Sequence, residues 1–142
     1  MTRVTRAQTL NPDRKKTEFY SDFLSSFAKT PVGNQLAKVT NERSINQSLK
    51  NILQTDLGER LFQPNLGSNV RAMLFDNNIE SNLTALEFYI TNSIEISEPR
   101  VNLIEVNVQA SKNENELIVN IIYNTINSPE PIIFEYILRR VR

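Results

Sequence analysis

The 142-residue chain contains no cysteine and no histidine, and it has only three glycines. Without cysteine it cannot form disulfides, thiolate metal sites or a cysteine nucleophile. Without histidine it lacks the Ser-His-Asp triad, the usual zinc ligands and the commonest acid–base group near neutral pH. Three glycines leave no room for a phosphate-binding GxxxxGK[ST] or GxGxxG loop. These absences favour a binding or assembly protein without metal or cofactor over an enzyme.

The chain also lacks long apolar runs, although 39% of its residues are hydrophobic. Its longest nearly apolar stretch, Ile132 to Leu138, is interrupted by Glu135, whereas a membrane helix needs about 20 apolar residues. No apolar segment follows the early arginines, so we predict neither a signal peptide nor a membrane helix, and a cytoplasmic place of synthesis. The length and ordinary composition predict a single domain that folds without disulfides.

The net charge is zero, but its distribution along the chain is uneven. Residues 1–16 hold five basic side chains against one acidic side chain, and the last four residues include three arginines. We predict that residues 1–18 form a flexible basic arm and that residues 19–142 form the domain. Basic ends can contact nucleic acid. Here no aromatic residues interleave with the basic ones, which favours a solvated terminus over nucleic-acid binding.

An aromatic-rich segment opens the domain. The apolar residues there are spaced by three and four, which predicts a short helix that ends before Pro31 and Gly33. The segment can pack on its own domain or grip a partner, and we favour packing on the domain because isolated aromatic residues are usually core residues. The residues concerned are Phe19, Tyr20, Phe23, Leu24 and Phe27.

Two longer helices are predicted from apolar stripes. The first spans 42–55, with Thr40 or Asn41 as N-cap and Gly58 as the residue that ends it; its stripe is Ile45, Leu49, Ile52 and Leu53. The second spans 79–94, begins after Asn77 or Asn78 and must stop before Pro99; its stripe is Leu83, Leu86, Ile90 and Ile94. Between them we expect an ordered loop over 58–67 and a short helix over 69–75.

From Val101 the apolar period changes to two, which predicts strands over 101–110, 117–126 and 132–139. A polar turn over 111–115 and a connection over 127–131 separate them. The expected inward faces are Ile104, Val106, Val108 and Ala110 in the first strand, and Ile132, Phe134, Tyr136 and Leu138 in the third. This order predicts an α+β fold, in which two main helices pack on a three-stranded antiparallel β-meander.

The edges of such a meander carry unpaired backbone groups, which can accept a strand from a partner. The alternative is that the arginine pair Arg139-Arg140 and the N-terminal arm protect the edge. The sequence leaves both possibilities open.

Two polar groups are candidate binding sites. Glu98 and Arg100 flank Pro99 and should project to the same side, because residues two apart in an extended segment share a face. Glu59 and Arg60 lie in the glycine-bounded loop. Each group can also be an ordinary solvated ion pair, but if the fold brings both loops to one end of the domain, a four-member Glu/Arg network becomes possible.

Catalysis by carboxylates alone is the alternative to a binding role. Glycoside hydrolysis needs only two acidic residues, and Glu59 with Asp56 or Glu98 with Glu95 are two candidate pairs among the many that any soluble domain offers. The chain has no tryptophan to stack on a sugar, and nothing in the sequence marks a sugar cleft.

The order of these segments resembles a known family. Residues 44–55 lead into the loop 58–67, then Glu98-Pro99-Arg100 and a strand from Val101 follow, and the stretch 20–23 precedes them. From about Tyr20 to the end, this pattern is similar to the small baseplate wedge proteins of contractile-tailed bacteriophages. Those include the T-even wedge subunit and the related subunit of type VI secretion baseplates.

The resemblance implies a structural protein of the virion tail baseplate, assembled in the host cytoplasm. Its implied partners are the core bundle of larger wedge proteins and the tail sheath subunits, with the tail tube or hub as further candidates. It implies that Glu98, Pro99 and Arg100 grip the core bundle, and Glu59 and Arg60 match the family's loop. Some family members have carried a lysozyme label, so a peptidoglycan hydrolase is the alternative function. A phage, a phage-derived particle and a secretion machine all remain open as the setting.

Overall fold

The computed structural model of the chain describes residues 18–31, 33–74, 82–111 and 116–139. The predicted arm up to residue 17, the caps Asn77 and Asn78, and most of the predicted turn over 111–115 lie outside the described residues. The predicted start of the second long helix, at residue 79, also lies outside the described residues.

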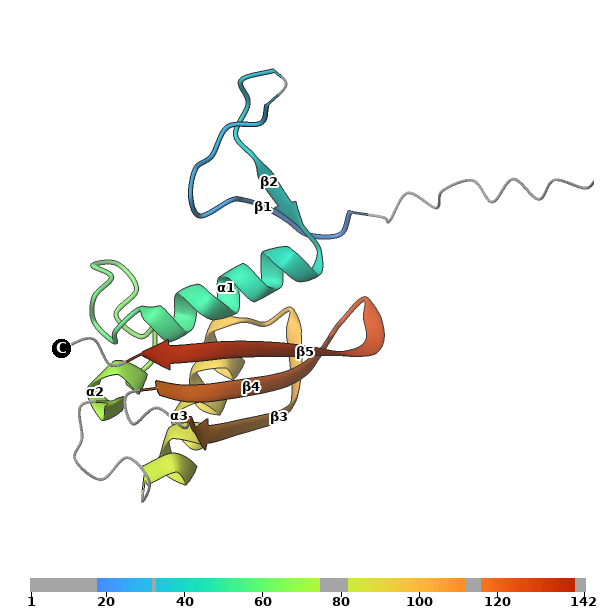
Figure 1. The fold of residues 1–142 in the computed structure, drawn as a ribbon. Helices are drawn as coiled ribbons and strands as arrows, with labels where there is room; N and C mark the ends of the chain where they lie inside the picture. Colours follow the sequence, from blue (N-terminus) through green and yellow to red (C-terminus); the bar gives the residue numbers. More distant parts are fainter. Residues whose placement is uncertain (1–17, 32, 75–81, 112–115, 140–142) are drawn as a thin grey trace, which may run out of the picture.

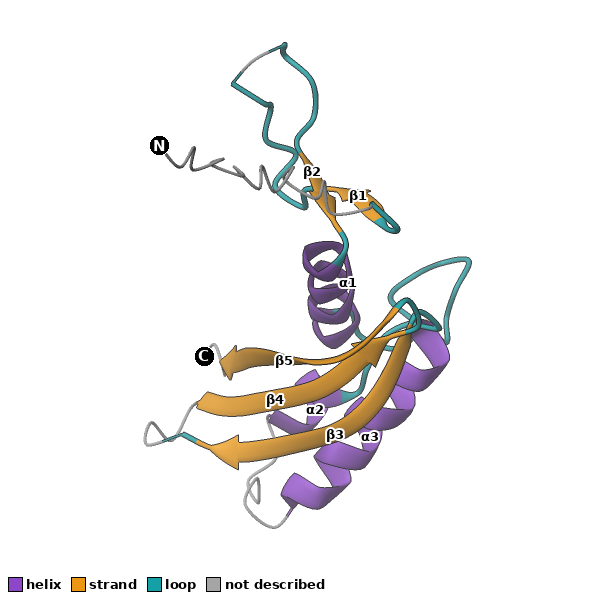
Figure 2. Cartoon of the chain, turned by 90° about the vertical axis from the view of Figure 1, so that its right-hand side faces the viewer, coloured by secondary structure: helices purple, strands orange, loops and turns teal. Residues whose placement is uncertain are grey.

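The prediction of an α+β fold is confirmed. The strands β3 (Val101–Ala110), β4 (Glu116–Thr125) and β5 (Ser128–Arg139) form an antiparallel sheet in the order β3-β4-β5. The helices α2 (Val70–Leu74) and α3 (Leu83–Ser97) pack on one face of that sheet, and α1 (Glu42–Gln54) lies next to β5 with its apolar stripe in the same core (Figures 1 and 2). The other face carries no described helix, and Figure 2 shows the sheet in front of α2 and α3.

The hydrophobic core lies between the helices and the inward face of the sheet. Its centre is formed by the predicted stripes of α1 and α3 together with β4, namely Ile45, Leu49, Leu53, Leu86, Ile90, Ile94, Val119, Ile121 and Tyr123. Tyr123 is fully buried, and its hydroxyl donates a hydrogen bond of 2.6 Å to Oδ1 of Asn46. Burial raises the pKa of Tyr123 to about 12, because the charged phenolate would lose its hydration. The phenol is therefore a neutral donor that links the central strand to α1.

The ends of the helices differ from the predicted caps. Asn41 precedes α1, but its side chain makes no cap hydrogen bond; its Oδ1 accepts the N–H of Phe19 at 2.9 Å instead. Gly58 lies beyond the helix end at Gln54, in the following loop with φ +82°, so it does not terminate α1. At the other helix, α3 continues to Ser97, three residues past the predicted end, and Pro99 still sets the limit.

A β-bulge in β3 changes which residues face the core. Leu103 is opposite Tyr123, whereas Glu105 is opposite Ile122, so Ile104 is an extra residue between them. An extra residue shifts the alternation of side chains by one position. The inward residues are therefore Val101, Leu103, Val106 and Val108. The prediction for Ile104, which is 56% exposed, was wrong. Ala110 lies on the predicted face, opposite the core residue Leu117, but it is exposed at the end of the strand.

The predicted connection over 127–131 was also wrong, because β5 begins at Ser128. Thr125 is opposite Ser128, which leaves Ile126 and Asn127 as a two-residue turn. Pro129 and Pro131 lie inside the edge strand β5, where a register irregularity follows the turn. Proline is tolerated in an edge strand where its missing N–H would face away from the sheet. The predicted inward face of this strand is confirmed.

The aromatic-rich segment is a hairpin and not a helix. The strands β1 (Ser21–Phe23) and β2 (Lys38–Thr40) pair antiparallel, and Figures 1 and 2 show the hairpin extending away from the body of the domain. Gln47 of α1 holds its backbone, because Nε2 donates to the carbonyl of Phe23 at 2.7 Å and Oε1 accepts the N–H of Ser25 at 3.0 Å. Phe19, Phe23 and Phe27 are all at least half exposed, so the prediction that they pack on the domain was wrong; only Tyr20 packs against the core.

Candidate functional site at the junction of α3 and β3

The Glu98-Pro99-Arg100 triplet forms the turn between α3 and β3. The N–H of Glu98 donates to the carbonyl of Ile94 at 2.8 Å, and the carbonyl of Glu98 accepts the N–H of Val101 at 3.2 Å. Pro99 excludes the helical conformation at the preceding residue, and Glu98 adopts φ −129° and ψ 78°. The helix therefore stops here and the chain reverses into the sheet.

Glu98 and Arg100 form a two-pronged ion pair, as their spacing predicted. Nε of Arg100 donates to Oε1 of Glu98 at 2.5 Å, and the second nitrogen donates to Oε2 at 2.7 Å. The Glu98 side chain is 3% exposed, whereas the Arg100 side chain is 35% exposed. The carboxylate is thus part of the interior, and the guanidinium reaches the surface.

The pKa of Glu98 lies below its ordinary value of 4.5. Burial acts to raise this pKa, but the hydrogen bonds from Arg100 and Ser48 and the positive charge of Arg100 outweigh it. The hydrogen bonds that Arg100 donates to Glu98 raise the pKa of Arg100 in turn. The pair is therefore ionised across the physiological pH range.

Tyr20 connects this ion pair to the root of the hairpin. The guanidinium carbon of Arg100 lies 5.4 Å from the centre of the Tyr20 ring, which is cation–π geometry. The Tyr20 hydroxyl accepts a hydrogen bond of 2.8 Å from Nδ2 of Asn127 in the β4–β5 turn. Sequence reasoning did not find Tyr20, Ser48 or Asn127 as neighbours of the pair. No local pattern could show these contacts, because they join segments far apart in the chain.

Glu59 and Arg60 lie in an ordered loop, as predicted. Oε2 of Glu59 accepts the N–H of Asp56 at 3.0 Å, and the N–H of Gly58 donates to the carbonyl of Pro64 at 2.9 Å. Glu59 thus closes the first turn of the loop. Arg60 is exposed and lines an open groove of about 440 Å³ with Phe23 of the hairpin and several polar residues of α1.

The two polar groups share a region of the surface but form no common network. Residues 62–66 of the loop and Ile96-Ser97 line one shallow groove of about 410 Å³, directly before Glu98. Within the described residues, however, no hydrogen bond or ion pair joins Glu59 or Arg60 to the Glu98–Arg100 pair. A network of all four would need groups supplied by a partner.

Gly67 holds the end of this loop against α1. It adopts φ +128°, and a Cβ atom there would lie 2.5 Å from the carbonyl oxygen of Thr55. We expect Gly67→Ala to destabilise the domain by about 2–3 kcal/mol, since backbone strain and a clash with main-chain atoms add. Urea unfolding measures this. Gly58→Ala is the matched control, because Gly58 also has positive φ but has no atom within 4 Å of its Cβ position. Equal losses in both variants would contradict the role of the close approach.

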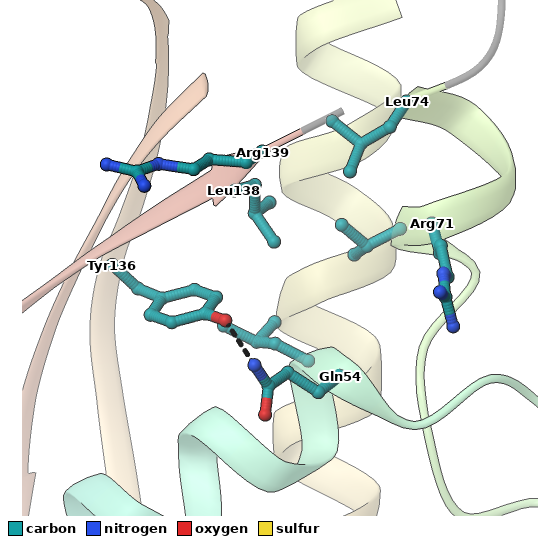
Figure 3. A pocket seen from close by; sticks show the side chains of 8 residues that line it. Gln54, Arg71, Leu74, Tyr136, Leu138 and Arg139 are labelled. Atoms are coloured by element: carbon teal, nitrogen blue, oxygen red, sulfur yellow. Dashed lines mark hydrogen bonds between the residues drawn. The ribbon is translucent and has the colours of Figure 1, made fainter. Parts of the chain in front are cut away.

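The cavity between the end of α1, α2 and β5 lacks the paired carboxylates of a glycoside hydrolase. The cavity in Figure 3, of about 280 Å³, lies between the end of α1, α2 and β5, and no carboxylate lines it. Gln54 Nε2 donates to the Tyr136 hydroxyl at 2.7 Å across it, and the guanidinium groups of Arg71 and Arg139 lie on opposite sides (Figure 3). Of the candidate acids, Glu98 is engaged by Arg100 and Glu59 by the Asp56 backbone. Within the described residues, no three acidic side chains gather as a metal site would require.

The family is established by sequence comparison. Residues 39–130 match the family described as baseplate wedge protein gp25. Baseplate wedge protein gp25 of Enterobacteria phage T4 is 30% identical over 115 residues, which cover 81% of this chain and 86% of that protein. The chain belongs to the gp25 family of baseplate wedge proteins. It is a baseplate protein of contractile-tail systems, and the predicted resemblance is confirmed.

Solved structures share the fold at lower identity. The anti-feeding prophage baseplate contains a chain with TM-score 0.66 and 23% identity, covering 78% of this chain and 89% of that one. A chain of the type VI secretion baseplate complex has TM-score 0.55 and 12% identity, covering 69% and 93%. A Geobacter sulfurreducens protein named as a candidate tail lysozyme has TM-score 0.66 and 23% identity, covering 73% and 95%. These likenesses concern the fold alone.

The helices of the described region are too short or too polar to cross a membrane.

Proposed function

We propose that this chain is the baseplate subunit on which the tail sheath begins to assemble. Glu98, Pro99 and Arg100, with Glu59 and Arg60, dock on the core bundle of the larger wedge proteins. The sheet accepts a strand from a sheath subunit and so sets the register of the first ring. The role is structural, without catalysis or cofactor. The observation that carries the proposal is the unpaired outer edge of β5.

The two edges of the sheet are not equivalent. At the β3 edge, Oε1 of Glu87 from α3 accepts the backbone N–H of Val108 at 2.9 Å. A carboxylate bound to an outward N–H blocks that edge against an added strand. Sequence reasoning left the choice of edge open, and the contact with Glu87 favours β5 as the accepting edge.

The outward groups of β5 follow from the alternation of hydrogen bonds in an antiparallel sheet. Two N–H groups fix the alternation between β3 and β4. The N–H of Ser111, directly after β3, donates to the carbonyl of Glu116 in β4, whereas the N–H of Val108 in β3 faces away from β4 and donates to Glu87. Bonded residues alternate along each strand, so the outward N–H and C=O groups of β5 belong to Ile133, Glu135 and Ile137. Pro131 is also an outward position in this alternation, but proline has no N–H to donate. A partner strand can therefore bond β5 from Ile133 towards the C-terminal end.

Docking by Arg100 and Arg60 is supported by their exposure. The Arg100 guanidinium is fixed by Glu98 and Tyr20 and still reaches the surface, so it can bind a partner without losing further side-chain freedom. Arg60 lies at the end of the groove beside α1, with no ion-pair partner among the described residues. Both arginines can therefore meet acidic or carbonyl groups of another chain.

A pull-down of the tagged full chain from its source particle tests the proposal. We expect recovery of the larger wedge proteins and of sheath subunits. Arg60→Ala should lower recovery of the wedge proteins several-fold, whereas Lys50→Ala, which removes one exposed charge from α1, should not. A tagged chain recovered with wedge proteins but without sheath would contradict the sheath role. Recovery of no tail component would contradict both roles.

A further inference from the structure

The uncovered face of the sheet carries an apolar patch on β4 and β5. Ile118 lies opposite Ile137, and Ile122 lies opposite Ile133, all on the side away from the helices. Ile133 is 70% exposed and Ile137 is 41% exposed. Between the two isoleucine pairs lies the pair Asn120–Glu135. We call these six residues the isoleucine face.

The pattern is unusual for a solvated sheet face. An antiparallel sheet with one face in water normally places polar residues on that face. After the bulge β3 follows this rule, because Glu105, Asn107 and Gln109 are its outward residues; its outward isoleucine is the bulge residue Ile104. On β4 and β5 the outward isoleucines instead recur at regular strand positions and form two cross-strand pairs. A contiguous apolar patch with a polar rim marks an interaction surface.

The charges of this face determine the kind of partner. Glu135 makes no ion pair among the described residues, although four isoleucines surround it. The basic residue nearby in sequence, Arg139, is bound to Glu116 at 3.0 Å. Glu105 adds a further acidic group on the neighbouring strand. A second copy of this chain across a two-fold axis would bring acidic groups together, which is unfavourable.

We propose that the isoleucine face binds an amphipathic segment of another baseplate protein. Aliphatic side chains of that segment cover the four isoleucines, and an arginine or lysine binds Glu135. This surface is distinct from the β5 edge and from the Glu98–Arg100 pair. The inference depends on the baseplate membership of the chain but not on its proposed sheath role.

Photo-crosslinking in the assembled particle tests this contact. Benzoylphenylalanine replaces Ile122 of the full chain, and a second preparation carries it at Ile118. Both positions lie on the central strand, where no strand can be added, so they report on the face and not on the edge. Particles that have incorporated the variant are irradiated, and the crosslinked peptide is identified by mass. We expect a peptide from a different baseplate protein with aliphatic residues and at least one arginine or lysine.

The charge dependence of the crosslink separates this contact from chance proximity. Glu135→Lys should lower the yield about tenfold, whereas the matched control Glu95→Lys on the exposed side of α3 should leave it unchanged. A crosslink to a second copy, a yield insensitive to Glu135→Lys, or no crosslink from either position in particles that contain the chain would overturn the proposal. Since such particles show baseplate incorporation, these outcomes leave the proposed function standing.

Discussion

Arg100→Leu is expected to lower the affinity of the chain for the wedge complex about a hundredfold or more. Removal of a charge from an interface leaves the groups that paired with it on the partner unpaired. The same change leaves the Glu98 carboxylate, which is 3% exposed, without its main donor. We therefore expect a loss of about 2–4 kcal/mol in unfolding free energy, since a buried charge without its partner is costly. Pull-down and urea unfolding measure the two effects separately.

A double variant separates docking from folding. Glu98→Gln in the Arg100→Leu background removes the buried charge, and its side chain can still bond Ser48. We expect this double variant to recover most of the lost stability but none of the binding to wedge proteins. Recovery of binding together with stability would show that Arg100 acts only through the fold of the domain. Normal binding by Arg100→Leu itself would exclude the docking role.

The pH dependence of stability should change sign in Arg100→Leu. In the wild type the pKa of Glu98 is lowered, so its contribution to stability is present above its ordinary value of 4.5 and is lost as pH falls through the folded-state pKa. Without Arg100, burial dominates and raises that pKa above 4.5. The contribution of Glu98 to stability should then decrease as pH rises through the raised pKa. Unfolding curves between pH 3 and pH 7 measure this difference between variant and wild type.

Ile133→Pro is expected to block sheath assembly while the chain still enters the baseplate. The N–H of Ile133 faces outward from β5, so its loss breaks no bond to β4. A proline ring at this edge removes the first donor that an added strand can use and obstructs its approach. We expect sheath-bearing particles to fall about tenfold or more, as counted by electron microscopy.

Two controls accompany this variant. Ile133→Ala removes the same side chain but keeps the N–H, so sheath assembly should persist. Phe134→Pro removes an N–H that faces β4, so it should unfold the domain. Normal sheath on Ile133→Pro baseplates would contradict strand addition at this edge. Loss of sheath in Ile133→Ala would assign the effect to the side chain and not to the backbone.

The local patterns of the sequence predicted most of the helix–sheet body. The stripe of α1 and the period-two alternation of β4 and of the inward face of β5 were predicted because each element buries one face. Glu98 and Arg100 were predicted as a pair because Pro99 restricts the chain between them. The failures occurred where distant segments compete with local preference. Residues 21–23 pair with 38–40 and are held by Gln47, which overrides the helical spacing of the aromatics.

The order and spacing of nearby residues were enough to predict the fold class, the core stripes, the Glu98–Arg100 pair and the family. They could not predict the cation–π contact of Tyr20 with Arg100, the hydrogen bond of Glu87 to the β3 edge or the outward position of Ile104 in a bulge. These contacts join residues distant along the chain, or depend on register between strands. Their energies arise only after the chain has folded, so no local pattern encodes them.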